Sequence, residues 1–134
     1  MNLPPPEPGR HLERAMDDVA REFYRRLADG SPATTRCRRC DVAYFPARLR
    51  CPGCGGETEW AELPRRGVLE AFTTQEAAVR FRAPAVLALA RLGNVTVPGI
   101  AMAAYEDLAI GAEVDVEPFA EPETGLTLIG FRPV

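Results

Sequence analysis

Residues 37–54 read CRRCDVAYFPARLRCPGC, and they contain all four cysteines of the 134-residue chain as two Cys-x2-Cys pairs. Each pair can form a tight turn that points two thiolates at one spot, and two such turns make a tetrahedral site of four sulfurs. Zinc accepts this donor set without any redox demand, and iron shares it. The spacing therefore predicts a metal site formed by Cys37, Cys40, Cys51 and Cys54, with zinc as the expected ion and iron as an open alternative. Four thiolates leave no free coordination position, so we expect the metal to be structural.

Four cysteines can also form two disulfides instead of a metal site. The N-terminus begins MNLPPPEP, which lacks the basic start and apolar core of a secretory signal peptide. No apolar run reaches the length needed to span a membrane. We therefore expect a cytoplasmic protein with no membrane segment, and in that reducing compartment paired Cys-x2-Cys motifs favour metal over disulfides.

The chain divides into four predicted parts. Residues 1–9 are proline-rich and predicted to be disordered. Residues 10–30 are predicted to hold a helix, because apolar residues recur every three or four positions and Gly30 is a stop signal. Residues 31–64 would form the ribbon around the cysteines, and residues 65–134 a β domain. The apolar stripe of the helix either packs on its own chain or offers Phe23, Tyr24 and Leu27 to a partner, and both interpretations stay open.

The β domain is predicted from five strand-like segments in about 65 residues, with no long helix between them. The third segment contains Pro98-Gly99, which predicts a bend or a break. A closed barrel of the OB type is the five-stranded barrel of this size. The expected strands are Val68–Thr74, Ala85–Leu92, Val95–Tyr105, Val114–Phe119 and Leu126–Phe131.

This order of elements resembles the DUF35 family of acyl-CoA-associated OB-fold proteins. The specific part of the resemblance is the cysteine spacing together with the insert Tyr44-Phe45-Pro46-Ala47-Arg48. Weaker matches are Gly67-Val68-Leu69, Pro84–Leu89, Leu108–Val114 and Phe131-Arg132-Pro133, and the position after Cys40, often glycine in the family, is Asp41. The resemblance implies a mainly β fold with an N-terminal helix, a small rubredoxin-like zinc ribbon and a C-terminal five-stranded OB-fold barrel.

Family members are commonly non-catalytic subunits of thiolase-like, ketosynthase-like or related acyl-CoA enzymes, and some help to hold CoA or the acyl chain. The resemblance therefore implies an accessory subunit, with a thiolase-like or ketosynthase-like enzyme as partner and a CoA ester or acyl carrier as ligand. Arg80, Phe81 and Arg82 are candidate ligand-binding residues, because arginines suit phosphates and an aromatic ring can cover an adenine or acyl group.

Two other classes of function are weighed against this one. A stand-alone enzyme acting on CoA esters needs a catalytic group, yet His11 is the only histidine and the metal site uses every thiol. A nucleic-acid-binding protein needs a basic groove with stacking aromatics, whereas residues 67–134 hold 4 arginines against 9 acidic residues. Both remain alternatives to the accessory subunit.

Overall fold

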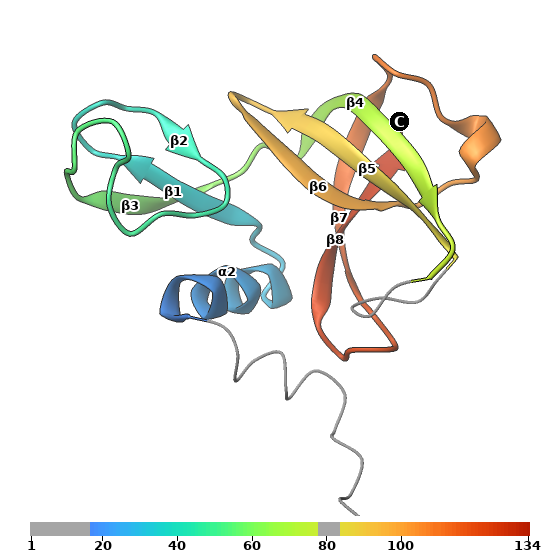
Figure 1. Ribbon diagram of the computed structural model, residues 1–134, viewed down its shortest axis with the longest axis horizontal. Helices are drawn as coiled ribbons and strands as arrows, with labels where there is room; N and C mark the ends of the chain where they lie inside the picture. Colours follow the sequence, from blue (N-terminus) through green and yellow to red (C-terminus); the bar gives the residue numbers. More distant parts are fainter. Residues whose placement is uncertain (1–16, 78–83) are drawn as a thin grey trace, which may run out of the picture.

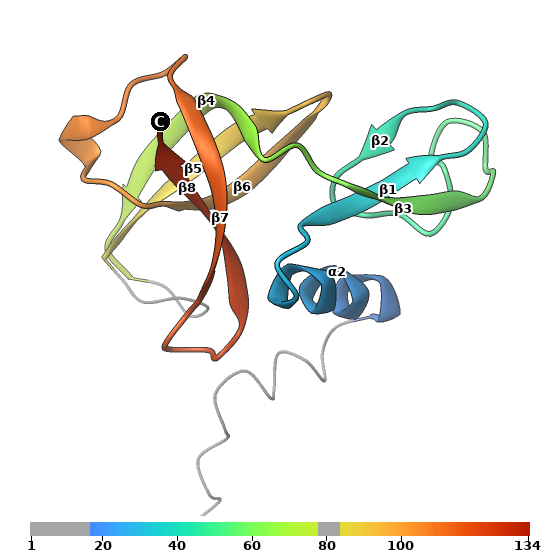
Figure 2. The same ribbon diagram turned by 180° about the vertical axis from the view of Figure 1, so that it is seen from behind.

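The computed structural model describes residues 17–77 and 84–134, which form a ribbon sheet, a closed barrel and a helix beside both (Figures 1 and 2). The helix α2 spans Asp18–Ala28, and the ribbon consists of β1 (Ala33–Cys37), β2 (Ala43–Tyr44) and β3 (Thr58–Glu62) in the order β2-β1-β3. The barrel strands are β4 (Arg66–Gln75), β5 (Ala85–Leu92), β6 (Val95–Ala101), β7 (Glu113–Ala120) and β8 (Thr127–Pro133), with a 3-10 helix η1 (Tyr105–Asp107) before β7. No helix in these two ranges is long and apolar enough to cross a membrane.

Helix α2 begins at a side-chain cap, and Leu27 in its last turn is buried. The Asp17 carboxylate accepts a hydrogen bond from the Ala20 backbone N–H at 2.8 Å, which satisfies a donor that the first turn leaves free. Glu22 accepts a hydrogen bond from Arg26 at 2.9 Å, which forms an ion pair one helical turn apart. Leu27 is 1% exposed and packs among the barrel residues. The predicted disordered segment 1–9 and the helical residues expected before Asp17 lie outside the described part of the chain.

The barrel has the connectivity of an OB fold. Its strand order is β4-β5-β6-β8-β7, closed by pairing of β4 with β7, and β6 runs parallel to β8 while the other pairs are antiparallel. This is the five-stranded Greek-key barrel that the sequence predicted. The predicted fold class is therefore confirmed: mainly β, with one helix, a ribbon and a five-stranded barrel.

The third strand differs from the prediction in two ways. It is continuous through Pro98-Gly99, and it ends at Ala101 rather than at Tyr105, which starts the 3-10 helix instead. Pro98 faces Leu89 of β5 and precedes the point at which β6 starts to pair with β8, so its missing N–H costs no bond to that strand. Gly99 lies against Phe131, because a Cβ there would sit 2.6 Å from the Phe131 ring. Close approach to Phe131 therefore explains Gly99, and Pro98 is tolerated because β8 does not pair with it.

Candidate metal centre and apolar groove

The structure brings the four cysteine sulfurs together. One Sγ atom from each of Cys37, Cys40, Cys51 and Cys54 lies within 4.8 Å of the others, and the Sγ atoms of Cys37 and Cys54 are 3.6 Å apart. A tetrahedral site with metal–sulfur bonds of about 2.3 Å needs sulfurs about 3.8 Å apart. The donor set therefore fits a tetrahedral metal ion, and these four residues would hold it.

Two similar turns place the thiols. In the first, the Asp41 N–H donates to the Cys37 carbonyl at 3.0 Å, and in the second the Gly55 N–H donates to the Cys51 carbonyl at 2.8 Å. Both residues that follow the turns have positive φ, 59° at Asp41 and 72° at Gly55. This left-handed conformation is open to glycine and tolerated by aspartate. It explains why a residue other than glycine can stand at the position after Cys40.

Backbone and side-chain donors point at the sulfurs. The Cys40 N–H donates to Cys37 Sγ at 3.2 Å, and the Gly53 N–H donates to Cys51 Sγ at 3.3 Å. The hydrogen bond with Tyr44 is the largest cause that lowers the pKa of Cys51, to about 6, and the backbone N–H of Cys40 lowers the pKa of Cys37. Hydrogen bonds with Cys54 and then Cys37 raise the pKa of Cys40 to about 12. The cluster therefore favours thiolates at the two buried cysteines, which is the form that binds metal.

Carboxylates neutralise part of the positive charge beside the cysteines. Arg36 pairs with Asp41 at 3.2 Å and with Glu59 at 3.3 Å, and Arg38 pairs with Glu59 at 3.5 Å. These pairs are substantially exposed, so they contribute little to stability. Arg36 and Arg38 are thus paired with carboxylates of the ribbon itself.

An apolar groove with a volume of about 940 Å³ lies between helix α2 and the outer face of the barrel. The barrel wall follows from strand register, since residues paired across an antiparallel sheet share a face. One row is Ala71, Leu89 and Pro98, and the next row is Thr73, Leu87 and Ile100. All six residues line the groove. Ala88 and Ala90, which alternate with them along β5, are buried, and Ala88 also borders the groove. The outer face of β4, β5 and β6 is thus apolar where it would ordinarily be polar.

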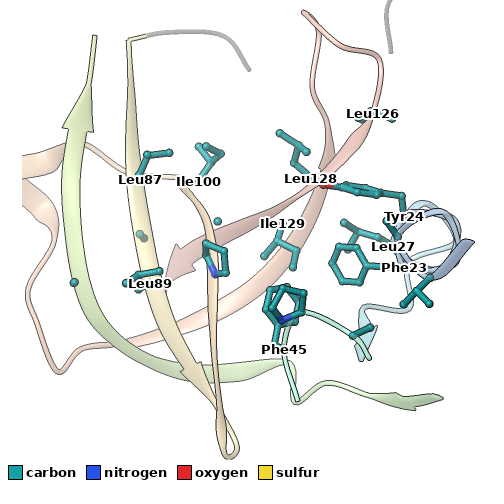
Figure 3. A pocket seen from close by; sticks show the side chains of 18 of the residues that line it. Phe23, Tyr24, Leu27, Phe45, Leu87, Leu89, Ile100, Leu126, Leu128 and Ile129 are labelled. Atoms are coloured by element: carbon teal, nitrogen blue, oxygen red, sulfur yellow. The ribbon is translucent and has the colours of Figure 1, made fainter. Parts of the chain in front are cut away.

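The opposite wall comes from the helix and the ribbon. Figure 3 shows Phe23 and Tyr24 pointing from α2 toward Leu128 and Ile129, with Leu87, Leu89 and Ile100 across the space. The Phe23 ring contacts the ring of Phe45, at 5.6 Å between centroids. Because Phe45 belongs to the insert between the cysteine turns, the ribbon helps to position this wall.

The predicted site residues are distributed as follows. The four cysteines meet at one point. Phe23, Tyr24 and Leu27 all line the groove. Phe23 and Tyr24 pack partly against the core, whereas Leu27 is 1% exposed and has almost no surface to offer a partner. Arg80, Phe81 and Arg82 lie outside the described residues. The groove itself was missed, although the nearly unbroken apolar run Ala85–Leu89 was its signal in the sequence.

Comparison with known proteins agrees with the geometry of the ribbon and the fold. Residues 34–60 match the family model described as the ChsH2 rubredoxin-like zinc ribbon domain. A DUF35 domain-containing scaffold protein of Methanocaldococcus jannaschii is 32% identical over 87 residues. Both matches support the resemblance of this chain to the DUF35 family. The match to the scaffold protein covers 60% of this chain and 62% of that protein, which is less than two thirds of its length.

Two solved structures share the fold of this chain. One, described as the Ltp2-ChsH2(DUF35) aldolase, superposes with a TM-score of 0.76 at 24% identity, covering 89% of this chain and 97% of the other. The second is a DUF35-family protein of unknown function from Sulfolobus solfataricus, with a TM-score of 0.65 at 17% identity and coverages of 90% and 88%. At these identities the likeness extends to the fold alone.

Proposed function

We propose that this protein is a member of the DUF35 family and a non-catalytic accessory subunit of a thiolase-like, ketosynthase-like or related acyl-CoA enzyme. In this proposal the four cysteines hold zinc as a structural ion, the ribbon docks on the catalytic partner, and the groove accommodates the acyl group of a CoA ester or acyl carrier. The observation that carries the proposal is the apolar outer face of β4, β5 and β6, which is built into the barrel and faces helix α2 across open space.

The chemistry of the groove suits binding of hydrocarbon. Its volume of about 940 Å³ lies within the usual range of about 300–1,000 Å³ for small-molecule sites, which are mostly apolar with a few polar groups. Among the described residues that line it, Asp17 and Tyr24 alone carry ionisable groups. This pairing of a large apolar surface with few ionisable groups favours holding a ligand over transforming it.

The same face argues against the nucleic-acid alternative. Strands two and three of an OB barrel are its usual ligand-binding face, and here these are β5 and β6. Binding of single strands needs cationic and aromatic side chains on that face, whereas β5 and β6 present Leu87, Leu89, Pro98 and Ile100.

The names of two relatives support a role beside an enzyme. The Methanocaldococcus jannaschii protein is described as a scaffold protein, and the similar structure pairs a DUF35 chain with Ltp2 in an aldolase. On the ribbon, Leu49 is 73% exposed and Val42 is also exposed, so both are available to a partner surface.

The partner is tested by co-expressing the protein with thiolase-like and ketosynthase-like proteins of the same genome and measuring co-elution by size-exclusion chromatography. We expect one of them to form a stable complex. Leu49→Asp should weaken that complex at least about tenfold, because a charge would be buried at the interface. Ile110→Asp, which is equally exposed but lies on the barrel, is the matched control and should leave the complex intact. If the protein co-elutes with none of these enzymes, the proposal that it binds such a partner is wrong.

The acyl site is tested by calorimetry on the protein with free CoA and with acyl-CoA esters of increasing chain length. We expect affinity to rise about fourfold for each methylene buried, which corresponds to about 0.8 kcal/mol. Leu89→Asp should abolish this rise, because Leu89 is 40% exposed and lines the groove. Ile110→Asp again serves as the control.

The result that counts against the acyl site is an affinity that does not depend on chain length. A salt-dependent shift with single-stranded DNA or RNA would favour the nucleic-acid alternative. Turnover of a CoA ester by the isolated chain would establish the stand-alone enzyme instead.

A further inference from the structure

Within the described residues, Tyr44 is the one side chain outside the cysteines that forms a hydrogen bond with a sulfur of the cluster. Its hydroxyl oxygen lies 3.5 Å from Cys51 Sγ. Cys51 is buried and already accepts a hydrogen bond from the Gly53 N–H. A thiolate bound to a metal carries no proton, so in the loaded site only the tyrosine can donate.

The ribbon holds Tyr44 in this position. Tyr44 lies on β2 opposite Thr35 of β1, and its carbonyl accepts a hydrogen bond from the hydroxyl of Thr34, a buried residue. Strand β1 carries the ligand Cys37 at its end. The tyrosine is therefore tied to the same strand as one pair of cysteines while its hydroxyl reaches the other pair.

Gly53 lies beside both the Tyr44 hydroxyl and the Cys51 sulfur. A Cβ at this position would lie 3.4 Å from the Tyr44 hydroxyl oxygen and 3.7 Å from Cys51 Sγ. Both separations are ordinary van der Waals contacts, so Gly53, which donates its N–H to the thiolate, packs directly beside the O–H donor.

We propose that Tyr44 is a positioning residue of the metal centre, which donates an O–H···S hydrogen bond to the Cys51 thiolate and slows release of the ion. The hydrogen bond withdraws electron density from one sulfur and fixes its direction. Groups that hydrogen-bond metal ligands typically change affinity about 10–100-fold. The role is independent of any partner or acyl ligand, so its test and that of the proposed function can fail separately.

The test compares the wild type with Tyr44→Phe, which keeps the ring and removes the hydroxyl. Both proteins are loaded with Co²⁺ for absorption spectroscopy and with Zn²⁺ for transfer to an excess of a colorimetric chelator. We expect full metal stoichiometry in the variant, a sulfur-to-cobalt charge-transfer band moved to lower energy, and transfer about tenfold faster. Tyr105→Phe, which alters an exposed tyrosine on η1, is the matched control and should change neither quantity.

A purely structural role for Tyr44 would lower thermal stability without moving the charge-transfer band. An unchanged band and an unchanged transfer rate in Tyr44→Phe would overturn the proposal. The wild type gives a second measurement that does not depend on folding of the variant: with ¹¹³Cd in the site, the Tyr44 hydroxyl proton should show scalar coupling to the metal across the hydrogen bond. Detection of that proton without coupling to ¹¹³Cd would also overturn it.

Discussion

Removal of the metal ion from the four-cysteine centre is expected to unfold the ribbon, residues 33–62, and to leave the barrel folded. The fully buried residues of the ribbon strands are small or polar, namely Ala33, Thr34, Thr35 and Cys37, whereas the large buried side chains such as Phe131 and Leu69 belong to the barrel. A segment of this size has too little apolar area to offset its conformational entropy. Binding of a structural metal by four thiolates contributes about 10–16 kcal/mol in comparable small units, so the ion should decide whether the ribbon folds.

Trp60 makes this outcome easy to measure. It is the only tryptophan, it lies on β3, and its ring is 5.0 Å from the Arg26 guanidinium carbon. Chelation, or the substitution Cys37→Ser, should shift its fluorescence to longer wavelength as the ring enters water. Added zinc should restore the original emission in the wild type but not in the Cys37→Ser variant. NMR signals of the barrel pair Phe72 and Tyr105, whose rings are 5.0 Å apart, should persist throughout. Unchanged Trp60 emission in the metal-free protein would contradict the expectation, and elemental analysis of the purified protein distinguishes zinc from iron.

Local patterns in the sequence were sufficient to predict the cysteine centre and the barrel. The turn geometry of Cys-x2-Cys is encoded in adjacent residues, so the convergence of four sulfurs follows from spacing alone. The second strand, Ala85–Leu92, was predicted to the residue because Gly93-Asn94 is a strong turn signal at its end. Gly93 has a φ of 65°, as such a turn requires.

Features that depend on contacts between distant segments were not predictable. The Pro98-Gly99 pair reads locally as a break, and the reason for the glycine is a ring on β8 that the local sequence cannot reveal. The groove depends on which side chains of β5 lie on the outer face of the barrel. A continuous apolar run does not specify which residues these are. The contact of Tyr44 with Cys51 needs the pairing of β1 with β2 as well as the second cysteine turn. In each case the missing information is the register between strands.

Substitution of Leu27 by alanine is expected to lower the free energy of unfolding by about 2–5 kcal/mol, the usual cost of truncating a fully buried leucine. Leu27 is 1% exposed and joins the same core as Ile129 and Phe131 of β8, so it is the one fully buried side chain by which α2 packs on the barrel. The loss should lower the melting temperature by roughly 10 °C or more. Because Phe23 and Tyr24 lie on the same helix and form one wall of the groove, weaker docking of α2 should also reduce affinity for long-chain acyl-CoA.

Val19→Ala separates these two effects. Val19 lies on the same helix and lines the groove, but it is only half-buried, so its truncation should cost about 1 kcal/mol and weaken acyl-CoA binding by a similar amount. Thermal unfolding followed by circular dichroism, together with calorimetry at a temperature where both variants are folded, gives the two quantities. A melting temperature for Leu27→Ala equal to that of the wild type would mean that α2 is not held by the barrel in solution. The groove would then lack a fixed wall, and the preference for longer acyl chains would have to come from the β5–β6 face alone.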